Sequence, residues 1–227
     1  MGSSKTSKQF IVDSWKKAAL GEHASVASFA KLVIQLIAIG APSHLIKSSL
    51  EAAQDELYHA KVCLTVANNL DSTSPQSFGI MEFGLQEMNI PVDTLEILKG
   101  AIVEGCLGEG FGTKYAEIAA NRAPDKIGNI LKKIADDEKR HENFAWEIVK
   151  YLTERDYELT NAARLIFESV IEEIEGSKII DESAGFGYLS VPELIGIRQK
   201  KLSEIKTEVN VFFYELHNRV GPERVIA

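Results

Sequence analysis

Two short motifs of the form Glu-x-x-His constrain the fold of this chain more than any other feature of its sequence. Glu56 and His59 form the first motif, and Glu138 and His141 form the second. Each motif lies in a stretch with helical periodicity, and residues three positions apart on a helix share one face. The glutamate and the histidine of each motif can therefore bind the same metal ion, and the pair of motifs predicts a two-metal site inside a helical bundle.

A lone glutamate precedes each motif by the same distance. Glu22 lies 34 residues before Glu56, and Glu104 lies 34 residues before Glu138. One ungapped shift of 82 positions aligns every proposed ligand and the turn between their helices: Glu22 with Glu104, Glu56 with Glu138, His59 with His141, and Ala41-Pro42 with Ala123-Pro124. The overall identity of the two halves is low, but the matches fall on the proposed ligands. The sequence therefore predicts six metal ligands, three from each half.

These six residues form a donor set that suits two divalent ions. Four carboxylates supply four negative charges against about four positive ones, and two imidazoles add nitrogen ligands that suit iron. A closed structural zinc site would favour cysteine, whereas Cys63 and Cys106 are isolated and are expected to be small buried residues. The set predicts two iron ions, as Fe/Fe or as Mn/Fe, with room for O₂ as a co-substrate.

Hydrophobic periodicity and turn signals predict an all-α protein. We expect helices over about residues 9–39, 44–68, 93–121 and 125–153, a long crossover over residues 69–92, and two further helices over about residues 159–175 and 192–220. Gly40 is the expected C-cap of the first helix, and Ser43 is the expected N-cap of the second. We interpret residues 1–227 as a single domain with a core bundle over residues 9–153 and a helical extension over residues 154–227.

The expected third helix carries an unusual density of glycine. Five glycines lie between residues 100 and 112, and glycine is costly in a helix interior. Either the helix is irregular there or a neighbour packs very close to its backbone. Gly105, Gly108 and Gly112 could also clear one face of the helix for a substrate or for oxygen.

Composition excludes several classes of function and location. The net charge of −8 argues against nucleic-acid binding, which needs clustered Lys and Arg. Two isolated cysteines form no disulfide framework and favour a reducing compartment. The first residues lack the apolar core of a signal peptide, and the longest apolar run, residues 32–41, is too short to cross a bilayer. We expect a cytoplasmic protein that binds neither nucleic acid nor a membrane.

The ligand pattern resembles the ferritin-like di-iron carboxylate superfamily. Residues 137–141, Asp-Glu-Lys-Arg-His, also resemble the Asp-Glu-x-Arg-His signature of its oxygen-activating members, although Tyr58 stands where Arg would be in the first copy. The resemblance covers about residues 15–153. It implies a ferritin-like four-helix bundle with a long crossover between helices 2 and 3, to which this chain adds two C-terminal helices. It also implies roles for the ligands: bridging carboxylates from Glu56 and Glu138, terminal carboxylates from Glu22 and Glu104, and terminal nitrogens from His59 and His141.

Four further residues are candidates for the same site. Asp55 and Asp137 each precede a motif glutamate, and we expect each to orient the histidine of the opposite half, because a ligating histidine commonly donates its other N–H to a carboxylate. Tyr115 lies about three turns after Glu104 and could relay an electron or line a substrate cavity, although a core tyrosine is the commoner case. Glu109 could be an extra carboxylate near the metals, although exposure is the simpler interpretation.

The expected function is that of an enzyme, a non-haem di-iron oxidase or oxygenase that activates O₂ to oxidise or oxygenate a small organic substrate. An electron-donor protein and a second copy of the chain, as a homodimer, are candidate partners. The alternative is a ferroxidase or iron-handling protein of the ferritin or bacterioferritin kind, with peroxide scavenging as a variant. A third interpretation is a non-enzymatic bundle whose acidic residues face solvent, since a buried row of carboxylates without metal would be severely unfavourable.

Overall fold

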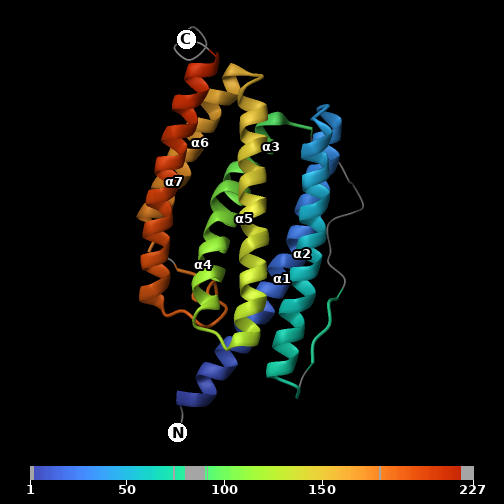
Figure 1. Cartoon of the computed structure of the whole chain (residues 1–227), viewed down its shortest axis with the longest axis vertical. Helices are drawn as coiled ribbons and strands as arrows, with labels where there is room; N and C mark the ends of the chain where they lie inside the picture. Colours follow the sequence, from blue (N-terminus) through green and yellow to red (C-terminus); the bar gives the residue numbers. More distant parts are fainter. Residues whose placement is uncertain (1–2, 74, 80–89, 91, 179, 221–227) are drawn as a thin grey trace. The chain divides into compact units, whose positions relative to one another are not determined.

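Every regular element is a helix in the part of the chain that the computed structural model describes, which is residues 3–73, 75–79, 90, 92–178 and 180–220. The helices are α1 (Ser3–Ala38), α2 (Ser43–Leu70), α3 (Thr94–Gly100), η2 (Ala101–Glu109), α4 (Gly110–Ala120), α5 (Asp125–Thr153), α6 (Tyr157–Gly176) and α7 (Val191–Val220) (Figure 1). The all-α prediction is confirmed. Part of the expected crossover, at residues 74, 80–89 and 91, lies outside the described residues. None of the described helices combines the length and apolar character needed to cross a membrane.

The turn between α1 and α2 follows one sequence signal and departs from another. Gly40 adopts a φ of +66°, and the N–H of Ala41 donates to the carbonyl of Leu36 at 2.9 Å, so the predicted glycine C-cap is confirmed. The predicted N-cap at Ser43 is wrong. Pro42 occupies that position with extended backbone angles, and Ser43 is already the first residue of α2. Proline has the required backbone conformation but no side-chain acceptor, so this helix begins without a side-chain cap.

The described residues fall into two compact units. The first comprises the described parts of Met1–Val92, Ala116–Ile134 and Asp181–Ser190, and the second those of Asp93–Tyr115, Ala135–Ile180 and Val191–Ala227. The helices α6 and α7 therefore belong to the same unit as η2 and most of α5. The division expected from the sequence, a core over residues 9–153 and an extension over residues 154–227, coincides with neither unit.

In the first unit, α1 and α2 pack side by side, and the loop before α7 is fixed to α1. The hydroxyl of Ser49 on α2 donates to the carbonyl of Phe29 on α1 at 3.1 Å. Trp15 of α1 is fully buried, and its ring lies 4.8 Å from that of Phe186 in the loop. These contacts join α1 to both α2 and the loop before α7.

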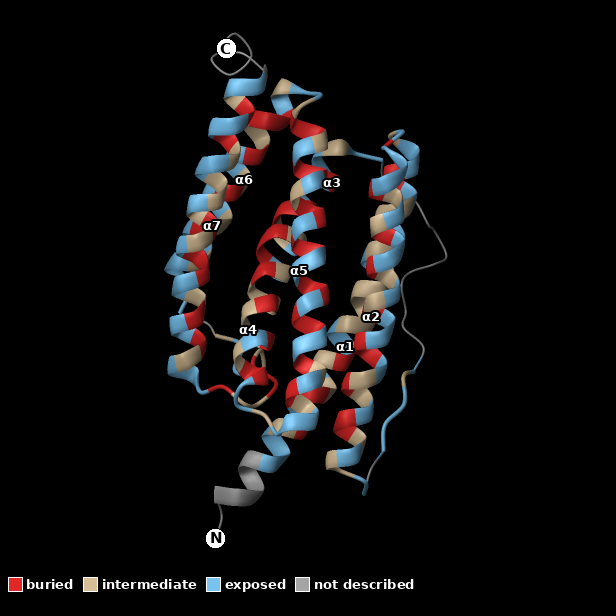
Figure 2. Ribbon diagram, viewed as in Figure 1, coloured by how far each residue is buried: buried red, intermediate tan, exposed pale blue. Residues whose placement is uncertain are grey.

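In the second unit, aromatic side chains join α5, α6 and α7. The rings of Trp146 on α5 and Phe167 on α6 stack at 5.2 Å, and Phe167 contacts Phe213 of α7 edge-on at 6.4 Å. Phe167 is fully buried, and buried residues recur at intervals along α5 (Figure 2). The two C-terminal helices thus share a hydrophobic core with the helix that carries the second Glu-x-x-His motif.

Both expectations for the glycine-rich stretch are confirmed. Residues 101–109 form a π-helix, η2, which is a rare conformation with i→i+5 hydrogen bonds. A Cβ added at Gly105 would lie 2.3 Å from the Cβ of Ala145 on α5. Gly105 therefore serves the close approach of η2 to α5.

Substituting Gly105 by alanine is expected to lower the free energy of unfolding by about 1–3 kcal/mol, because the new methyl group would force η2 away from α5. Gly100 provides the matched control, since a Cβ there meets nothing within 4 Å. Gly100→Ala should stabilise the protein by about 0.5–1 kcal/mol through the better helix propensity of alanine. Urea unfolding of the two variants tests this contrast, and equal effects would contradict it.

Candidate metal site

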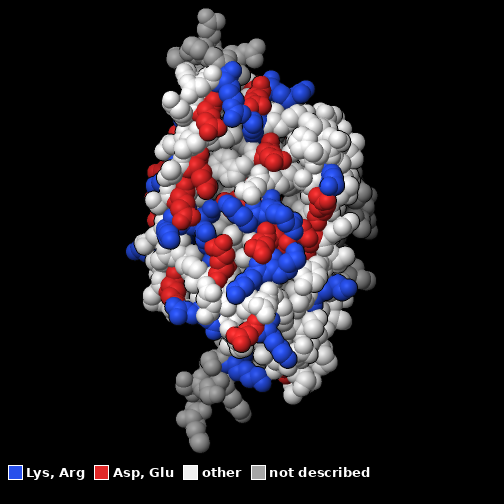
Figure 3. All heavy atoms as spheres, viewed as in Figure 1, with Lys and Arg blue, Asp and Glu red and all other residues white. Residues whose placement is uncertain are grey.

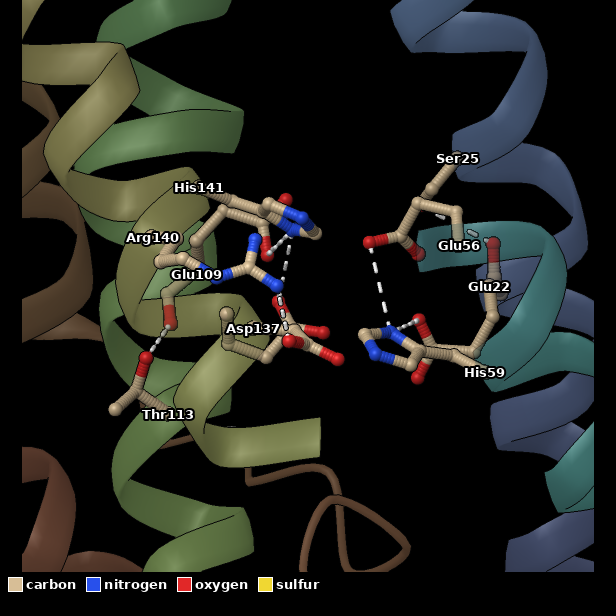
Figure 4. Close-up of polar contacts among 11 residues, drawn as sticks. Glu22, Ser25, Glu56, His59, Glu109, Thr113, Asp137, Arg140 and His141 are labelled. Carbon is tan, nitrogen blue, oxygen red and sulfur yellow. Dashed lines mark hydrogen bonds and ion pairs between the residues drawn. The ribbon is translucent and has the colours of Figure 1, made fainter. Parts of the chain in front are cut away.

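In the first unit, α1 and α2 bring together two carboxylates and one imidazole. Nδ1 of His59 lies 3.7 Å from Oε1 of Glu56, one helical turn earlier on α2, and 3.9 Å from Oε2 of Glu22 on α1 (Figure 4). His59 and Glu56 are buried, and the Glu22 side chain is 17% exposed. The three residues each offer one ligand atom, and these atoms lie within 4.8 Å of one another. We call Glu22, Glu56 and His59 the first triad.

In the second unit, η2 and α5 provide the same three groups. Nδ1 of His141 lies 3.9 Å from Oε2 of Glu138 on α5 and 4.0 Å from Oε2 of Glu109, the last residue of η2 (Figure 4). His141 and Glu138 are buried, and the Glu109 side chain is 17% exposed. Their ligand atoms also lie within 4.8 Å of one another. We call Glu109, Glu138 and His141 the second triad.

The geometry of both triads fits a metal ion. The separations of 3.7–4.0 Å between imidazole nitrogen and carboxylate oxygen exceed those of a hydrogen bond. Two ligands that each bind one ion at about 2.0–2.2 Å lie about 3–4.4 Å apart. In both triads the carboxylates approach Nδ1, and the mixture of carboxylate oxygen and imidazole nitrogen suits a first-row divalent ion. Each triad could therefore hold one metal ion.

Glu104, the ligand expected from the 34-residue spacing, does not join the second triad. Its side chain is exposed, and among the described residues it belongs to no group of carboxylates and histidines that could hold an ion. Glu109, for which exposure was the simpler expectation, takes this place. The 34-residue spacing selects Glu104 only if the helix keeps 3.6 residues per turn. The π-helix places more residues in each turn, and this changes which side chain faces α5.

The other candidates from the sequence are Asp55, Asp137 and Tyr115, and they differ in burial and in contacts. Asp137 is buried and forms an ion pair with Arg140 one turn later on α5 (Figure 4), whereas Asp55 is half-buried on α2. Their predicted bonds to the histidine of the opposite half stay predictions. Tyr115 lies on α4, beyond the π-helix, and its ring stacks on that of Phe111 at 6.4 Å.

Both cysteines are fully buried, as the sequence predicts. Burial raises the pKa of the Cys106 thiol well above its usual range, and the nearby carboxylates of Glu142 and Glu208 add to this effect. Neither cysteine belongs to a group of described residues that could hold an ion. The candidate ligands are thus oxygen and nitrogen atoms only.

We expect neither thiol to react with a disulfide reagent such as Ellman's reagent at pH 8 while the protein is folded. A thiol must be deprotonated and accessible to attack, and the buried Cys106 is neither. Both should react once urea unfolds the chain. Stopped-flow absorbance would measure the two rates, and rapid modification of the folded protein would contradict the burial described above.

The surface charge and the comparisons with known proteins are two further sources of functional information. On the face drawn in Figure 3, lysine and arginine side chains gather across the middle, with aspartate and glutamate side chains beside them. Comparisons with models of known protein families, with curated proteins and with solved structures find no match. The two triads therefore carry the functional argument by themselves.

Proposed function

We propose that each triad binds one iron ion and that the protein is a non-haem di-iron oxidase or oxygenase. One observation carries this proposal: in each unit an imidazole Nδ1 and two carboxylates, drawn from two helices, meet within 4.8 Å. Burial supports it, because carboxylates removed from water are severely unfavourable unless a cation compensates their charge. The same donors suit manganese, so a Mn/Fe centre belongs to the same proposal.

The repeat in the sequence supports the pairing of the two ions. The sequence resembles the ferritin-like superfamily, and a di-iron centre of that kind would be held here by the two triads, with Glu22, Glu56 and His59 for one ion and Glu109, Glu138 and His141 for the other. Two ferrous ions supply electrons for the reduction of O₂, and the protein sets their geometry and access. The side chains of this chain hold the ions, offset their positive charge and keep the centre away from bulk water. A small organic substrate, an electron-donor protein and a cytoplasmic location complete the proposal.

The first test is the metal content of the full chain after anaerobic loading with Fe²⁺. We expect about two iron ions per chain, one for each triad. Glu56→Ala and Glu138→Ala should each lose bound iron. Glu104→Ala is the matched control, because this exposed glutamate lies outside both triads, and it should keep the wild-type content. A wild-type chain that binds no iron would refute the proposal.

Mixing the ferrous protein with oxygen separates the enzyme from the iron-handling alternative. An oxidase or oxygenase should consume O₂ in proportion to the iron bound in the two triads, without mineral growth. Continued oxidation of many added Fe²⁺ equivalents, with accumulation of a ferric core, would instead support a ferroxidase or storage role.

A further inference from the structure

A buried ion pair lies beside the second triad, and its lysine comes from α7, a helix that carries no residue of that triad. Nζ of Lys201 on α7 donates to Oε1 of Glu142 on α5 at 2.7 Å. The side chains are only 2% and 1% exposed. Lysine and glutamate are rarely buried so completely. The pair therefore needs a reason beyond the general packing of α7 against α5.

The pair contacts the backbone directly after the π-helix. A Cβ added at Gly110 would lie 2.8 Å from Cε of Lys201 and 3.0 Å from Oε1 of Glu142. A side chain at this position would require Lys201 or Glu142 to shift. Gly110 immediately follows Glu109, so the ion pair packs against the segment that presents this carboxylate to His141.

Along the chain, the pair also adjoins His141, the imidazole of the second triad. Glu142 immediately follows His141 on α5. The Lys201–Glu142 pair thus contacts the end of η2 and holds the turn of α5 that bears His141. Glu109 is the last residue of η2, where the rare i→i+5 pattern gives way to the α-helical pattern of α4, so contacts at this junction help to set the direction of its side chain.

Further charged and polar groups complete the surroundings of Glu142. Nζ of Lys139, on the same helix, donates to its second oxygen, Oε2, at 2.8 Å. Cys106 of η2 lies within the electrostatic reach of Glu142, Lys201 and Glu208. Glu208 lies two turns after Lys201 on α7 and has one buried carboxylate oxygen with no hydrogen-bond partner in the structure. Both oxygens of Glu142 therefore have lysine donors, which fixes the orientation of its carboxylate.

We propose that Lys201 and Glu142 are positioning residues that set the geometry of Glu109 and His141, so that α7 is part of the metal centre. The inference rests on the proposed function, because it assigns these residues to the ion in the second triad. Apolar side chains of similar size would fill the same space without the cost of removing two charges from water. They would not reproduce the hydrogen-bonded ion pair that joins α7 to α5 beside Gly110, the residue after Glu109.

The test replaces the pair by apolar groups and measures the metal site instead of the stability. The full-length double variant Lys201→Met/Glu142→Leu would be titrated with Co²⁺ alone, and its d–d absorption compared with that of the wild type. We expect one of two ions to bind about 10–100-fold more weakly, as is typical when groups supporting metal ligands are changed. The absorption bands of that ion should also shift at saturating Co²⁺, which a loss of stability alone would not cause.

The control is the double variant Lys206→Met/Glu175→Leu. It removes an exposed ion pair of 2.6 Å between α7 and α6, and it should bind Co²⁺ as the wild type does. If the apolar double variant does not fold, Glu142→Gln replaces it in the test, because glutamine keeps the size of the side chain. This variant should shift the same absorption bands, by less than is expected for the double variant. If the variant binds Co²⁺ with wild-type affinities and shows wild-type absorption bands, the inference is overturned while the proposed function stands. A wild-type chain that binds no Co²⁺ would overturn the proposed function and the inference with it.

Discussion

Replacing Lys201 alone by methionine is expected to lower the free energy of unfolding by about 3 kcal/mol, because it leaves the carboxylate of Glu142 buried with one of its two charge partners removed. Lys139 still donates to Oε2 of Glu142, and its side chain is 47% exposed, so it offsets only part of the loss. The effect is therefore expected near the lower end of the range for broken buried pairs. Urea unfolding followed by circular dichroism would measure it.

Two further variants serve as controls for Lys201→Met. Adding Glu142→Leu should restore at least wild-type stability, because it removes the buried charge together with its partner. Lys206→Met, which breaks the exposed pair with Glu175 on the same helix, should change the free energy of unfolding by less than about 1 kcal/mol. If Lys201→Met cost no more than Lys206→Met, burial of the pair would have no energetic consequence.

The second large effect is the stabilisation of the folded chain by metal. At a free Co²⁺ concentration about 1,000 times the dissociation constant of a site, binding should raise the free energy of unfolding by about 4 kcal/mol for that site. The reason is that the unfolded chain does not present the three ligands of a triad together. Chelation with EDTA should remove the increase, and thermal or urea unfolding with and without Co²⁺ would measure it.

Glu109→Ala and Glu104→Ala form the matched pair for this measurement. Glu109 lies 4.0 Å from Nδ1 of His141, whereas Glu104 is exposed five residues earlier in the same π-helix. Glu109→Ala should lose most of the stabilisation contributed by the ion in the second triad, and Glu104→Ala should keep it. The opposite result would restore the ligand expected from the regular spacing and contradict the placement of Glu109.

Helix boundaries were largely predictable because local chemistry determines them. Gly40 ends α1 in the left-handed conformation that favours glycine, as expected. By contrast, α6 begins at Tyr157, capped by Asp156, instead of near residue 159. Where two residues compete for one cap, as Pro42 and Ser43 do, backbone preference decided against the side-chain signal. Other boundaries also differ from the expectation: α1 begins at Ser3 instead of near residue 9, and the π-helix η2 interrupts the helix expected over residues 93–121.

Five of the six expected ligands occur in the triads because their spacing depends only on regular α-helices. Glu56 with His59 and Glu138 with His141 lie three residues apart on one helix, where the count holds. Glu104 was misplaced because the repeat gives no sign of the π-helix between it and the following residues. The density of glycine was the available signal: it indicated an irregular helix but not which carboxylate would face α5.

The buried pair could not be read from the sequence at all. Lys201 and Glu142 are 59 residues apart, and a lysine among the charged residues of an amphipathic helix is normally solvent-exposed. Only the packing of α7 against α5 and against the backbone at Gly110 shows that both charges are enclosed. Such long-range pairs depend on tertiary structure, which no local periodicity encodes.

The aromatic contacts among α5, α6 and α7 have a consequence for how the protein could be dissected. Phe167 of α6 and Phe212 of α7 pack against Trp146 on the helix that presents Glu138 and His141, so removing the last third of the chain would remove one side of the core of the second unit. A shortened version ending near residue 153 would be an incomplete module with an open hydrophobic side. Dissecting the protein into stable pieces would therefore have to keep α6 and α7 together with the part of α5 that carries the second triad.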